Sequence, residues 1–251
     1  MHPILVKIGP VTIYTYGFFI ASAFLLALGY VSREAKKQKL DAKIVSDLGF
    51  YIIIAGILGA RFLYVLMNLK YFLNHPLEAF MVWKGGLVFS GGAILGLFTA
   101  VLYLKSKAQD VWQWADLFAP AIALGQFVGR FGCLMAGCCY GRYCTLPWAI
   151  TFKNPDSLAP INIPLHPTQI YHSLAGLVTF FILSFVKTKV KQKGVLFGLF
   201  LVLYGLFRFT IEFFRGDFRP MFYVFSYTQW GALVLSFIGV MIVSLRYKRE
   251  S

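Results

Sequence analysis

The chain has 251 residues, of which 59% are hydrophobic and only 14% are charged, whereas a soluble domain carries about 25% charged residues. Its formal net charge is +14, but the basic residues lie in short segments between apolar runs of about 20 residues. This pattern excludes a soluble nucleic-acid-binding protein and predicts an all-α, polytopic membrane protein.

Seven apolar runs are long enough to cross the roughly 30 Å hydrocarbon core of a bilayer. In chain order, the predicted spans cover residues 13–30, 45–69 and 87–104, a fourth run that begins near Asp116, and residues 169–186, 195–214 and 228–245. We find no internal repeat and no soluble second domain, which predicts a single integral membrane domain over residues 1–251. Between the fourth and fifth spans, about residues 142–167 contain five prolines, and we expect an irregular extracytoplasmic loop there.

The distribution of basic residues predicts the orientation of these spans. Fourteen lysines and arginines lie in segments 32–43, 105–110 and 187–193 and in the tail from residue 246, whereas six lie in the segments on the opposite face. Short loops rich in Lys and Arg stay in the cytoplasm. We therefore expect an extracytoplasmic N-terminus and a cytoplasmic C-terminus, which agrees with an odd number of spans.

Three arginines lie inside predicted spans, where an ionisable side chain is energetically unfavourable and usually functional. Arg61, Arg130 and Arg208 lie about 24, 21 and 20 Å from the cytoplasmic ends of their spans, at a rise of about 1.5 Å per residue. Because these depths agree, we expect a layer of guanidiniums in the outer half of the membrane that binds an anionic phospholipid headgroup. For Arg61, the sequence favours neither this functional role nor a purely structural one.

A second group of charges follows Arg208. Arg208, Glu212 and Arg215 have i, i+4, i+7 spacing, which predicts that they share one helix face. Glu212 can then pair with either arginine and leave the other guanidinium free for a phosphate. The alternative is a structural arginine–carboxylate clamp between helices, and we interpret Glu212 as an orienting partner rather than a proton-transfer group.

The fourth span ends in the stretch LGQFVGRFGCLMAGCCYGRYC, residues 124–144, in which glycines allow a helix or a ligand to approach Arg130 closely. All four cysteines of the chain lie here: Cys133, Cys138, Cys139 and Cys144. Their spacing is not a standard zinc motif. We therefore favour a local disulfide or packed free thiols over a metal site or catalytic thiols. In a disulfide, Cys133 or Cys138 would bond to Cys139 or Cys144.

Six separated segments resemble, in the same order, those of the prolipoprotein diacylglyceryl transferase family. GRFGCLMAGCCYG, residues 129–141, is similar to the family signature GRxGNFxNxExxG. The others are IGPVTIYTYG, DLGFYIIIAGILGARFLYVL, VWKGGLVFSGGAILG, HPTQIY and YGLFRFTIEFFRGD. The resemblance implies catalytic roles for Tyr16, Ser90, Arg130 and Arg208. It implies substrate-binding roles for Arg61, Gly129, Gly132, Cys133, Gly141, His166, Glu212 and Arg215.

The resemblance also implies an activity and a location. A multi-pass enzyme of the bacterial cytoplasmic (inner) membrane would transfer the diacylglyceryl group of phosphatidylglycerol to the lipobox cysteine of a lipoprotein precursor, forming a thioether and releasing glycerol 1-phosphate. Its partners would be phosphatidylglycerol, a lipobox-containing prolipoprotein and membrane lipid, with no nucleic acid, and no metal or other cofactor would be required. Arg130 and Arg208 would stabilise the charge that develops on the leaving phosphate.

The sequence departs from the family at several positions. Ser90 stands where the family commonly has a histidine with a base-like role, and His172 stands where it often has glutamate. In the signature, Cys133, Ala136 and Cys138 replace two asparagines and a glutamate.

The general base is therefore open. Candidates are Tyr16, His166, His172 and the leaving phosphate itself. We hypothesise that a cationic pocket lowers the pKa of the acceptor thiol, so that no dedicated base is needed and Ser90 only orients a group by hydrogen bonding.

A small membrane transporter or lipid-binding protein for an anionic ligand is the alternative class. Transporters often have internal repeats and spans that are broken at the midplane. This sequence has one broken span, no repeat, and charges toward the outer side of the membrane. It therefore favours the transferase.

Overall fold

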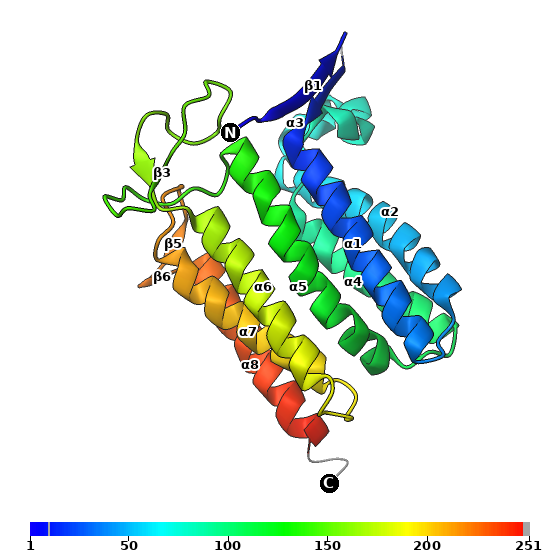
Figure 1. The fold of residues 1–251 in the computed structure, drawn as a ribbon. Helices are drawn as coiled ribbons and strands as arrows, with labels where there is room; N and C mark the ends of the chain where they lie inside the picture. The colour runs from blue at the N-terminus through cyan, green and yellow to red at the C-terminus, as the bar shows by residue number, and fades with distance from the viewer. Residues whose placement is uncertain (10, 248–251) are drawn as a thin grey trace. The chain divides into compact units, whose positions relative to one another are not determined.

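The computed structural model describes residues 1–9 and 11–247, with only the backbone at Ile8, Val11 and Lys84 (Figure 1). Within these residues, seven helices are long and apolar enough to cross a membrane, which confirms the seven predicted spans. They are α1 (Thr15–Lys37), α2 (Ala42–Met67), α4 (Phe89–Ser106), α5 (Val111–Ala136), α6 (Thr168–Val186), α7 (Val195–Glu212) and α8 (Tyr227–Tyr247). Lys248 and Arg249, which contribute to the predicted orientation, lie outside the described residues.

Helix α1 continues past the predicted end of the first span at residue 30. The sequence predicts a loop from residue 32, but SREAKK remains helical to Lys37. Val31 and Ala35 are fully buried, and Ala, Lys, Arg and Glu have high helix propensity. Lys36 and Lys37 also lie in the last turn, where cations interact favourably with the helix dipole.

Short elements connect the long helices. An antiparallel hairpin of β1 (Ile4–Ile8) and β2 (Val11–Tyr14) precedes α1. Between α2 and α4 the chain forms α3 (Leu69–Asn74) and the 3-10 turns η1 (Pro76–Phe80) and η2 (Val82–Lys84). Two further antiparallel pairs join β3 (Ile150–Thr151) to β4 (Pro164–Leu165) and β5 (Met221–Phe222) to β6 (Phe225–Ser226).

Contacts within the chain divide it into two compact units, one of residues 32–114 and the other of residues 1–31 with 115 onward. In the unit of residues 32–114, glycines let α2 and α4 approach each other. A Cβ atom at Gly59 would lie 2.5 Å from the carbonyl oxygen of Gly91, so these glycines serve close helix packing. The single-domain organisation remains a prediction.

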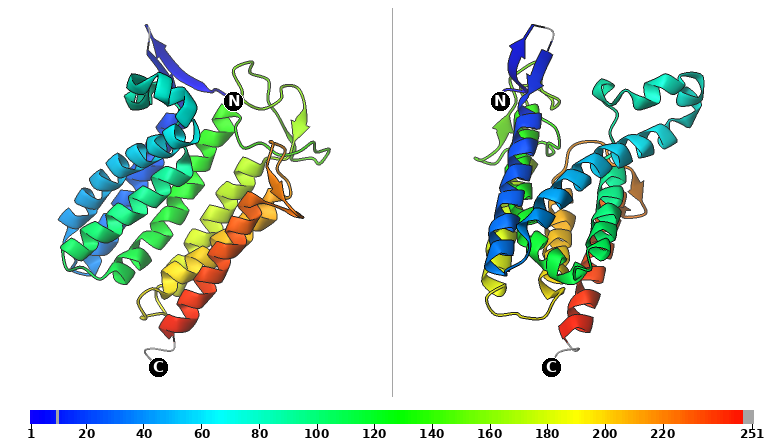
Figure 2. Two further views of the ribbon diagram at one scale, coloured as in Figure 1. Left: turned by 180° about the vertical axis from the view of Figure 1, so that it is seen from behind. Right: turned by 90° about the vertical axis from the view of Figure 1, so that its right-hand side faces the viewer.

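In the second unit, α6, α7 and α8 lie side by side (Figures 1 and 2). Asp116 of α5 also caps α7, because its carboxylate accepts hydrogen bonds from the backbone N–H groups of Gly194 at 2.6 Å and Phe197 at 2.8 Å. A carboxylate at this position satisfies free N–H groups and interacts favourably with the helix dipole. The buried apolar residues that join α5, α6 and α7 are Ala119, Ala123, Leu183, Leu196 and Phe200.

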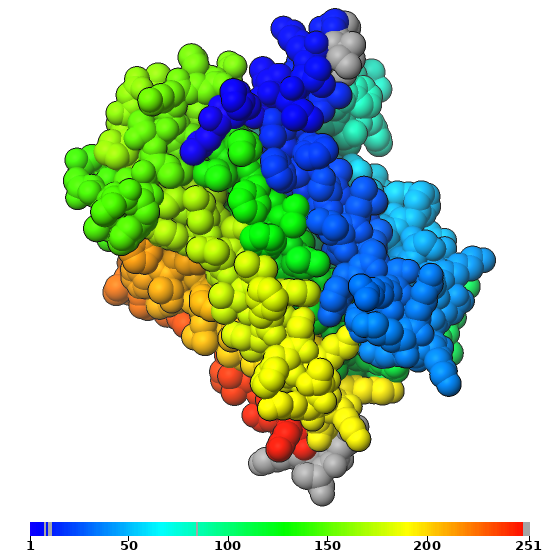
Figure 3. All heavy atoms as spheres, viewed as in Figure 1, coloured from blue at the N-terminus to red at the C-terminus, as the bar shows by residue number. Residues whose placement is uncertain are grey.

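The segment between α5 and α6 is more ordered than an exposed loop. It contains β3 and β4, and the side chain of Phe152 is buried in a small apolar core with Leu134, Ala159 and Leu165. The space-filling view shows it as a closely packed lobe in green and yellow-green (Figure 3). Its irregular backbone agrees with the prediction, but its apolar residues fold back onto the end of α5 because they bury surface there.

Candidate active site

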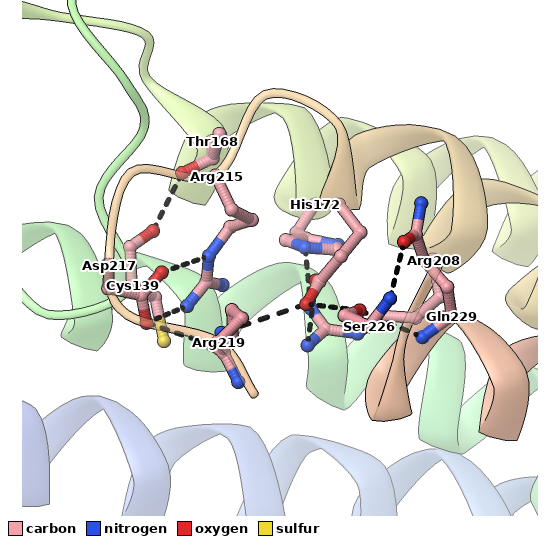
Figure 4. A network of polar contacts seen from close by, with 10 residues as sticks. Cys139, Thr168, His172, Arg208, Arg215, Asp217, Arg219, Ser226 and Gln229 are labelled. Carbon is pink, nitrogen blue, oxygen red and sulfur yellow. Dashed lines mark hydrogen bonds and ion pairs between the residues drawn. The ribbon is translucent and has the colours of Figure 1, made fainter. Parts of the chain in front are cut away.

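Polar side chains from several elements of the second unit meet close to one another. Figure 4 shows contributions from the turn after α5, from α6 and α7, from the loop after α7, and from the start of α8. The loop segment runs from residue 213 to residue 226 and carries two arginines and an aspartate. The resulting network contains several of the predicted site residues.

Gly141 lies at a junction of three backbone segments. Its N–H donates to the carbonyl of His166 at 3.1 Å, and the next N–H, of Arg142, donates to the carbonyl of Phe214 at 2.9 Å. Gly141 also forms an antiparallel bridge with Arg215. A Cβ atom here would collide with the carbonyl oxygens of His166 and Phe214. The junction therefore requires glycine and fixes the cysteine turn beside the loop that carries Arg215.

Arg208 is held by two neighbours. Its Nη1 donates a hydrogen bond to Nε2 of His172 at 2.8 Å, and its Nη2 forms an ion pair with Oε2 of Glu212 at 3.3 Å. Because Nε2 accepts from a guanidinium, His172 is neutral and carries its proton on Nδ1. The predicted pair of Arg208 and Glu212 is thus present. His172, which stands where the family often has glutamate, is the second partner of Arg208.

Arg215 does not share a helix face with Arg208 and Glu212. Helix α7 ends at Glu212, and Arg215 lies in the following loop, where it pairs with Asp217 through two hydrogen bonds of 2.8 and 2.7 Å. The prediction from i, i+7 spacing is therefore wrong, because the helical repeat stops one turn early. Glu212 instead has Arg219 as its second cationic neighbour, at 3.6 Å.

The pair of Arg215 and Asp217 is mutually stabilising. The side chain of Arg215 is 1% exposed. Burial alone would raise the pKa of Asp217, but hydrogen bonds and charge from Arg215, together with the charge of Arg219, hold that pKa below its usual value. Burial alone would lower the pKa of Arg215, yet its hydrogen bonds to Asp217 and Cys139 raise it. Both groups are therefore charged at neutral pH.

Among the residues that the structure describes, Arg130 is the arginine of this site whose guanidinium remains free to bind a ligand. Within the described residues, its half-buried guanidinium makes no hydrogen bond or ion pair. Its charge nevertheless acts on Arg208 and His172, as does the charge of Arg215. The three guanidiniums therefore form one positive region, in which Arg208 and Arg215 have protein partners and Arg130 is available to an anion.

Three of the four cysteines form a cluster beside this region. The sulfur atoms of Cys133, Cys138 and Cys139 all lie within 4.8 Å of one another. All four cysteines are free thiols, so the structure agrees with packed thiols and not with the expected alternative of a disulfide. Cys144 is separate and buried, and its sulfur accepts a hydrogen bond from the N–H of Leu146 at 3.4 Å.

The start of α6 holds the cysteine turn in place. Thr168 donates through Oγ1 to the carbonyl of Cys139 at 2.6 Å, and Gln169 donates through Nε2 to the carbonyl of Cys138 at 2.8 Å. Cys139 has φ of 60°, a conformation that non-glycine residues adopt rarely. The HPTQIY motif thus positions the cysteines, in addition to starting α6 at Thr168, one residue before the predicted start of the fifth span.

The thiols in the cluster are not equivalent. Hydrogen bonds from Cys133 and Cys138, followed by the charges of Arg215 and Arg130, hold the pKa of Cys139 below its usual range. The same hydrogen bonding, together with burial, raises the pKa of Cys138. Cys139 therefore has the strongest thiolate character.

Tyr16 reaches the same region from α1. The backbone and ring of Tyr16 pack against Gly132, where a Cβ atom would lie 3.2 Å from the carbonyl oxygen and 3.3 Å from Cδ2 of Tyr16. Gly129, one turn earlier, faces Ile20 and Ala23 of α1. Tyr16 is 43% exposed and lies within electrostatic range of Arg130 and the three clustered cysteines. The two signature glycines therefore bring α1 against α5.

His166 lies at the edge of the site. Its Nδ1 is 3.1 Å from the hydroxyl of Tyr171, which also accepts a hydrogen bond from Trp148. Burial and the charge of Arg142 lower the pKa of His166. It is therefore neutral at neutral pH and is held by aromatic neighbours.

A cavity of about 310 Å³ opens beyond the end of α7. Three residues that line it each have a buried polar atom without a hydrogen-bond partner among the described residues, namely Nη1 of Arg215, Nε of Arg219 and Oε2 of Glu212. Buried polar groups are normally hydrogen-bonded. The cavity thus brings the charged side chains of Arg215, Arg219 and Glu212 to a polar ligand. The polar residues that line it are Glu212, Arg215, Asp217, Arg219, Ser226 and Gln229.

Arg61 belongs to the unit of residues 32–114, where backbone carbonyls surround it. Its guanidinium donates to Ala79 at 2.8 Å, to Gly85 at 2.6 Å, and also to Glu78 and Gly86. This arrangement fixes the segment between α3 and α4 and favours the structural role. Substrate binding by Arg61 remains a prediction.

Ser90 lies in the same unit as Arg61, in the first turn of α4, and is exposed. The second unit brings together the other predicted residues: Tyr16, Gly129, Arg130, Gly132, Cys133, Gly141, His166, Arg208, Glu212 and Arg215. Asp217 and Arg219 were not among the predicted site residues, although the alternating charges of RGDFR are a detectable signal. Ser226, which donates to Oε1 of Glu212 at 3.4 Å, was not among them either.

The sequence is similar over almost its whole length to proteins of one family. Residues 3–245 match the family profile described as prolipoprotein diacylglyceryl transferase. A phosphatidylglycerol–prolipoprotein diacylglyceryl transferase of Clostridium tetani is 35% identical over 251 residues, which cover 100% of both chains. Proteins of the same name from Vibrio atlanticus and Bordetella avium are 36% and 34% identical, and each match covers 99% of this chain and 92% and 96% of the relative, respectively.

Proposed function

The chain belongs to the prolipoprotein diacylglyceryl transferase family, and we propose that it transfers the diacylglyceryl group of phosphatidylglycerol to the cysteine thiol of a lipoprotein precursor. The products are a thioether-linked lipid and glycerol 1-phosphate. Both substrates are anchored in the membrane, which agrees with a chain that has seven membrane-length helices. The protein is thus assigned to the bacterial cytoplasmic membrane.

The observation that carries this proposal is the positive region around Arg130. Arg208 and Arg215 are fixed by His172 and Asp217, whereas Arg130 has no hydrogen-bond or ion-pair partner among the described residues. A guanidinium that is held near other cations and left unpaired binds a phosphate diester through charge-assisted hydrogen bonds. Arg130 therefore has the principal phosphate-binding role in the proposal.

The chemistry requires a negative charge to develop on the phosphate as its bond to the glyceryl carbon breaks. Positive groups that are preorganised for this charge stabilise the transition state more than the ground state. Arg130 and Arg208 are assigned this role. The cavity after α7, with donors on Arg215 and Arg219 and an acceptor on Glu212, suits the hydroxyls and phosphate of a glycerol phosphate headgroup.

The orientation that fits this reaction has the N-terminus outside the cytoplasm and the C-terminus inside. It rests on the excess of Lys and Arg in the segments that join α1 to α2, α4 to α5 and α6 to α7. The site would then lie in the outer half of the membrane. Phosphatidylglycerol of the outer leaflet and a secreted lipobox cysteine reach this half without crossing the membrane.

A direct assay tests the activity. The purified protein in detergent is incubated with phosphatidylglycerol and a lipobox peptide, and the peptide is analysed by mass spectrometry. The proposal predicts that the cysteine gains the mass of a diacylglyceryl group and that glycerol 1-phosphate is released. If the peptide is unchanged while phosphatidylglycerol-containing vesicles with the protein move an anionic solute across the membrane, the protein is a transporter and the proposal is wrong.

A further inference from the structure

The three-thiol cluster lies in a site whose two histidines are both engaged by other residues. Ser90 provides no basic group, His172 already accepts a hydrogen bond from Arg208, and His166 is turned toward Tyr171. A thiol must nevertheless lose its proton before it attacks carbon. Beside Arg130, the chain places three further thiols whose sulfur atoms lie within 4.8 Å of one another.

We propose that Cys133, Cys138 and Cys139 bind one zinc ion and that the acceptor cysteine of the lipoprotein precursor becomes its fourth ligand. The inference rests on the proposed transferase function. In this proposal the site holds a metal ion, and coordination to that ion activates the substrate thiol.

The geometry of the cluster suits zinc. Zinc–sulfur bonds are about 2.3 Å long, so two sulfur atoms on one tetrahedral ion lie about 3.8 Å apart. The three sulfur atoms lie within 4.8 Å of one another, so binding requires them to approach one another by at most about 1 Å. The backbone already holds the ligands, because Thr168 and Gln169 bind the carbonyls of Cys139 and Cys138.

The number of ligands indicates an open site. Within the described residues, no fourth His, Cys, Asp or Glu ligand atom joins the cluster. Structural zinc sites use four protein ligands, whereas sites that react with a substrate use three and keep one position open. Cys138 and Cys139 are partly exposed, whereas Cys133 is buried.

Charge also favours a thiolate site here. Three thiolates and one Zn²⁺ carry a net charge of about −1, and the charges of Arg215 and Arg130 both act on Cys139. A fourth thiolate from the substrate increases the negative charge on the sulfur atoms. That increase makes the bound sulfur a better nucleophile, and the nearby guanidiniums stabilise it.

The step balances without any other reactant. The acceptor thiol binds the zinc ion and loses its proton. Its sulfur then forms a bond to the glyceryl carbon that carries the phosphate, and the carbon–oxygen bond breaks with its electron pair remaining on the phosphate oxygen. The proton released on coordination is taken up by the glycerol 1-phosphate that leaves. Nothing is oxidised or reduced.

Metal binding is tested first, on the reduced, metal-free, full-length protein in detergent. Titration with Zn²⁺ is expected to give one ion per chain. Co²⁺, used as a spectroscopic probe, should show sulfur-to-cobalt charge-transfer bands. Cys138→Ser and Cys139→Ser should lose both signals, and Cys144→Ser should keep them, because Cys144 lies outside the cluster. Circular dichroism of each variant checks that it is folded, and equal binding by wild type and Cys138→Ser would overturn the inference.

The role of the fourth ligand is tested next. Adding a lipobox peptide to the Co²⁺ protein should shift the cobalt bands, whereas the same peptide with serine in place of cysteine should not. Removing zinc should lower the transfer rate roughly 100-fold, as for loss of a general base, and adding Zn²⁺ should restore it.

The outcomes separate the two proposals. Full transfer by metal-free protein, or cobalt bands that do not respond to the cysteine peptide, overturns the inference and leaves the transferase function in place. Zinc binding with a peptide-dependent shift, but no transfer with or without metal, supports the site and contradicts the proposed function.

Discussion

Arg208 donates a hydrogen bond from Nη1 to Nε2 of His172, at 2.8 Å, inside the second structural unit. His172 is 1% exposed, so the bond is shielded from water. An imidazole that accepts in this way is neutral and acts as an orienting partner for the arginine. His172 therefore positions the guanidinium of Arg208. Glu212 is the second residue that orients it.

Replacing His172 tests this positioning role. His172→Leu removes the acceptor, and a hydrogen bond to a charged group contributes about 1.5–3 kcal/mol. We therefore expect kcat/KM for diacylglyceryl transfer to fall roughly 10- to 100-fold. His172→Gln retains an acceptor and should recover most of the activity. Equal activity of the Leu and Gln variants, at equal melting temperature, would show that the hydrogen bond does not orient Arg208.

Asp217 should make stability depend on pH in the acidic range. Because its pKa is lower in the folded protein than in the unfolded chain, the ionised pair contributes fully above about pH 4. The contribution is lost as the pH falls through the lowered pKa. In thermal unfolding at a series of pH values, Asp217→Asn should lower the melting temperature at pH 7 and flatten its decline in acid. Asp156→Asn, at an exposed position, should behave like the wild type.

Gly141 should tolerate no side chain. A Cβ atom would collide with the carbonyl oxygens of His166 and Phe214, and these backbone atoms cannot move without breaking the junction. We expect Gly141→Ala to destabilise the protein by about 1–3 kcal/mol and to reduce transfer. In Gly29→Ala, the added Cβ has nothing within 4 Å. This control should be neutral or stabilising by up to about 1 kcal/mol. Similar melting temperatures for the two variants would refute the steric argument.

Arg61 should protect the backbone amides of the segment between α3 and α4 from hydrogen exchange. Its guanidinium holds the carbonyls of Glu78, Ala79, Gly85 and Gly86, which a lysine ammonium cannot bridge together. Hydrogen exchange by mass spectrometry should therefore rise in residues 76–88 of Arg61→Lys. Arg130→Lys should leave exchange in that segment unchanged. Loss of phosphatidylglycerol binding by Arg61→Lys without a change in exchange would instead support the substrate-binding prediction.

Hydropathy was sufficient to predict the seven spans, because a bilayer imposes length and apolarity on each helix. It did not locate helix ends. SREAKK continues α1 because Val31, just before it, and Ala35, within it, are buried. Conversely, α7 ends at Glu212 although the apolar pattern continues. The position of Arg215 depends on that end, and the spacing argument failed for that reason.

Most residues of the candidate site could be predicted from the sequence, but the contacts between their side chains could not. The arginines stand out in the sequence because charge inside an apolar span is unusual. Their pairing could not be predicted, because His172 reaches Arg208 from another helix and Asp217 meets Arg215 in a loop that depends on where α7 ends. The approach of three cysteine sulfur atoms depends on a residue with positive φ, Cys139, which spacing alone does not reveal.

The role of Arg130 in phosphate binding is decided by the transfer rates of the wild type and Arg130→Ala, measured by mass spectrometry of a lipobox peptide with saturating phosphatidylglycerol. We expect a diacylglyceryl mass gain with the wild type and with Lys153→Ala, an exposed control. We expect a rate at least roughly 100-fold lower for Arg130→Ala, comparable to loss of one preorganised donor to a developing negative charge. A wild-type rate for Arg130→Ala, or no mass gain with the wild type, would contradict this expectation.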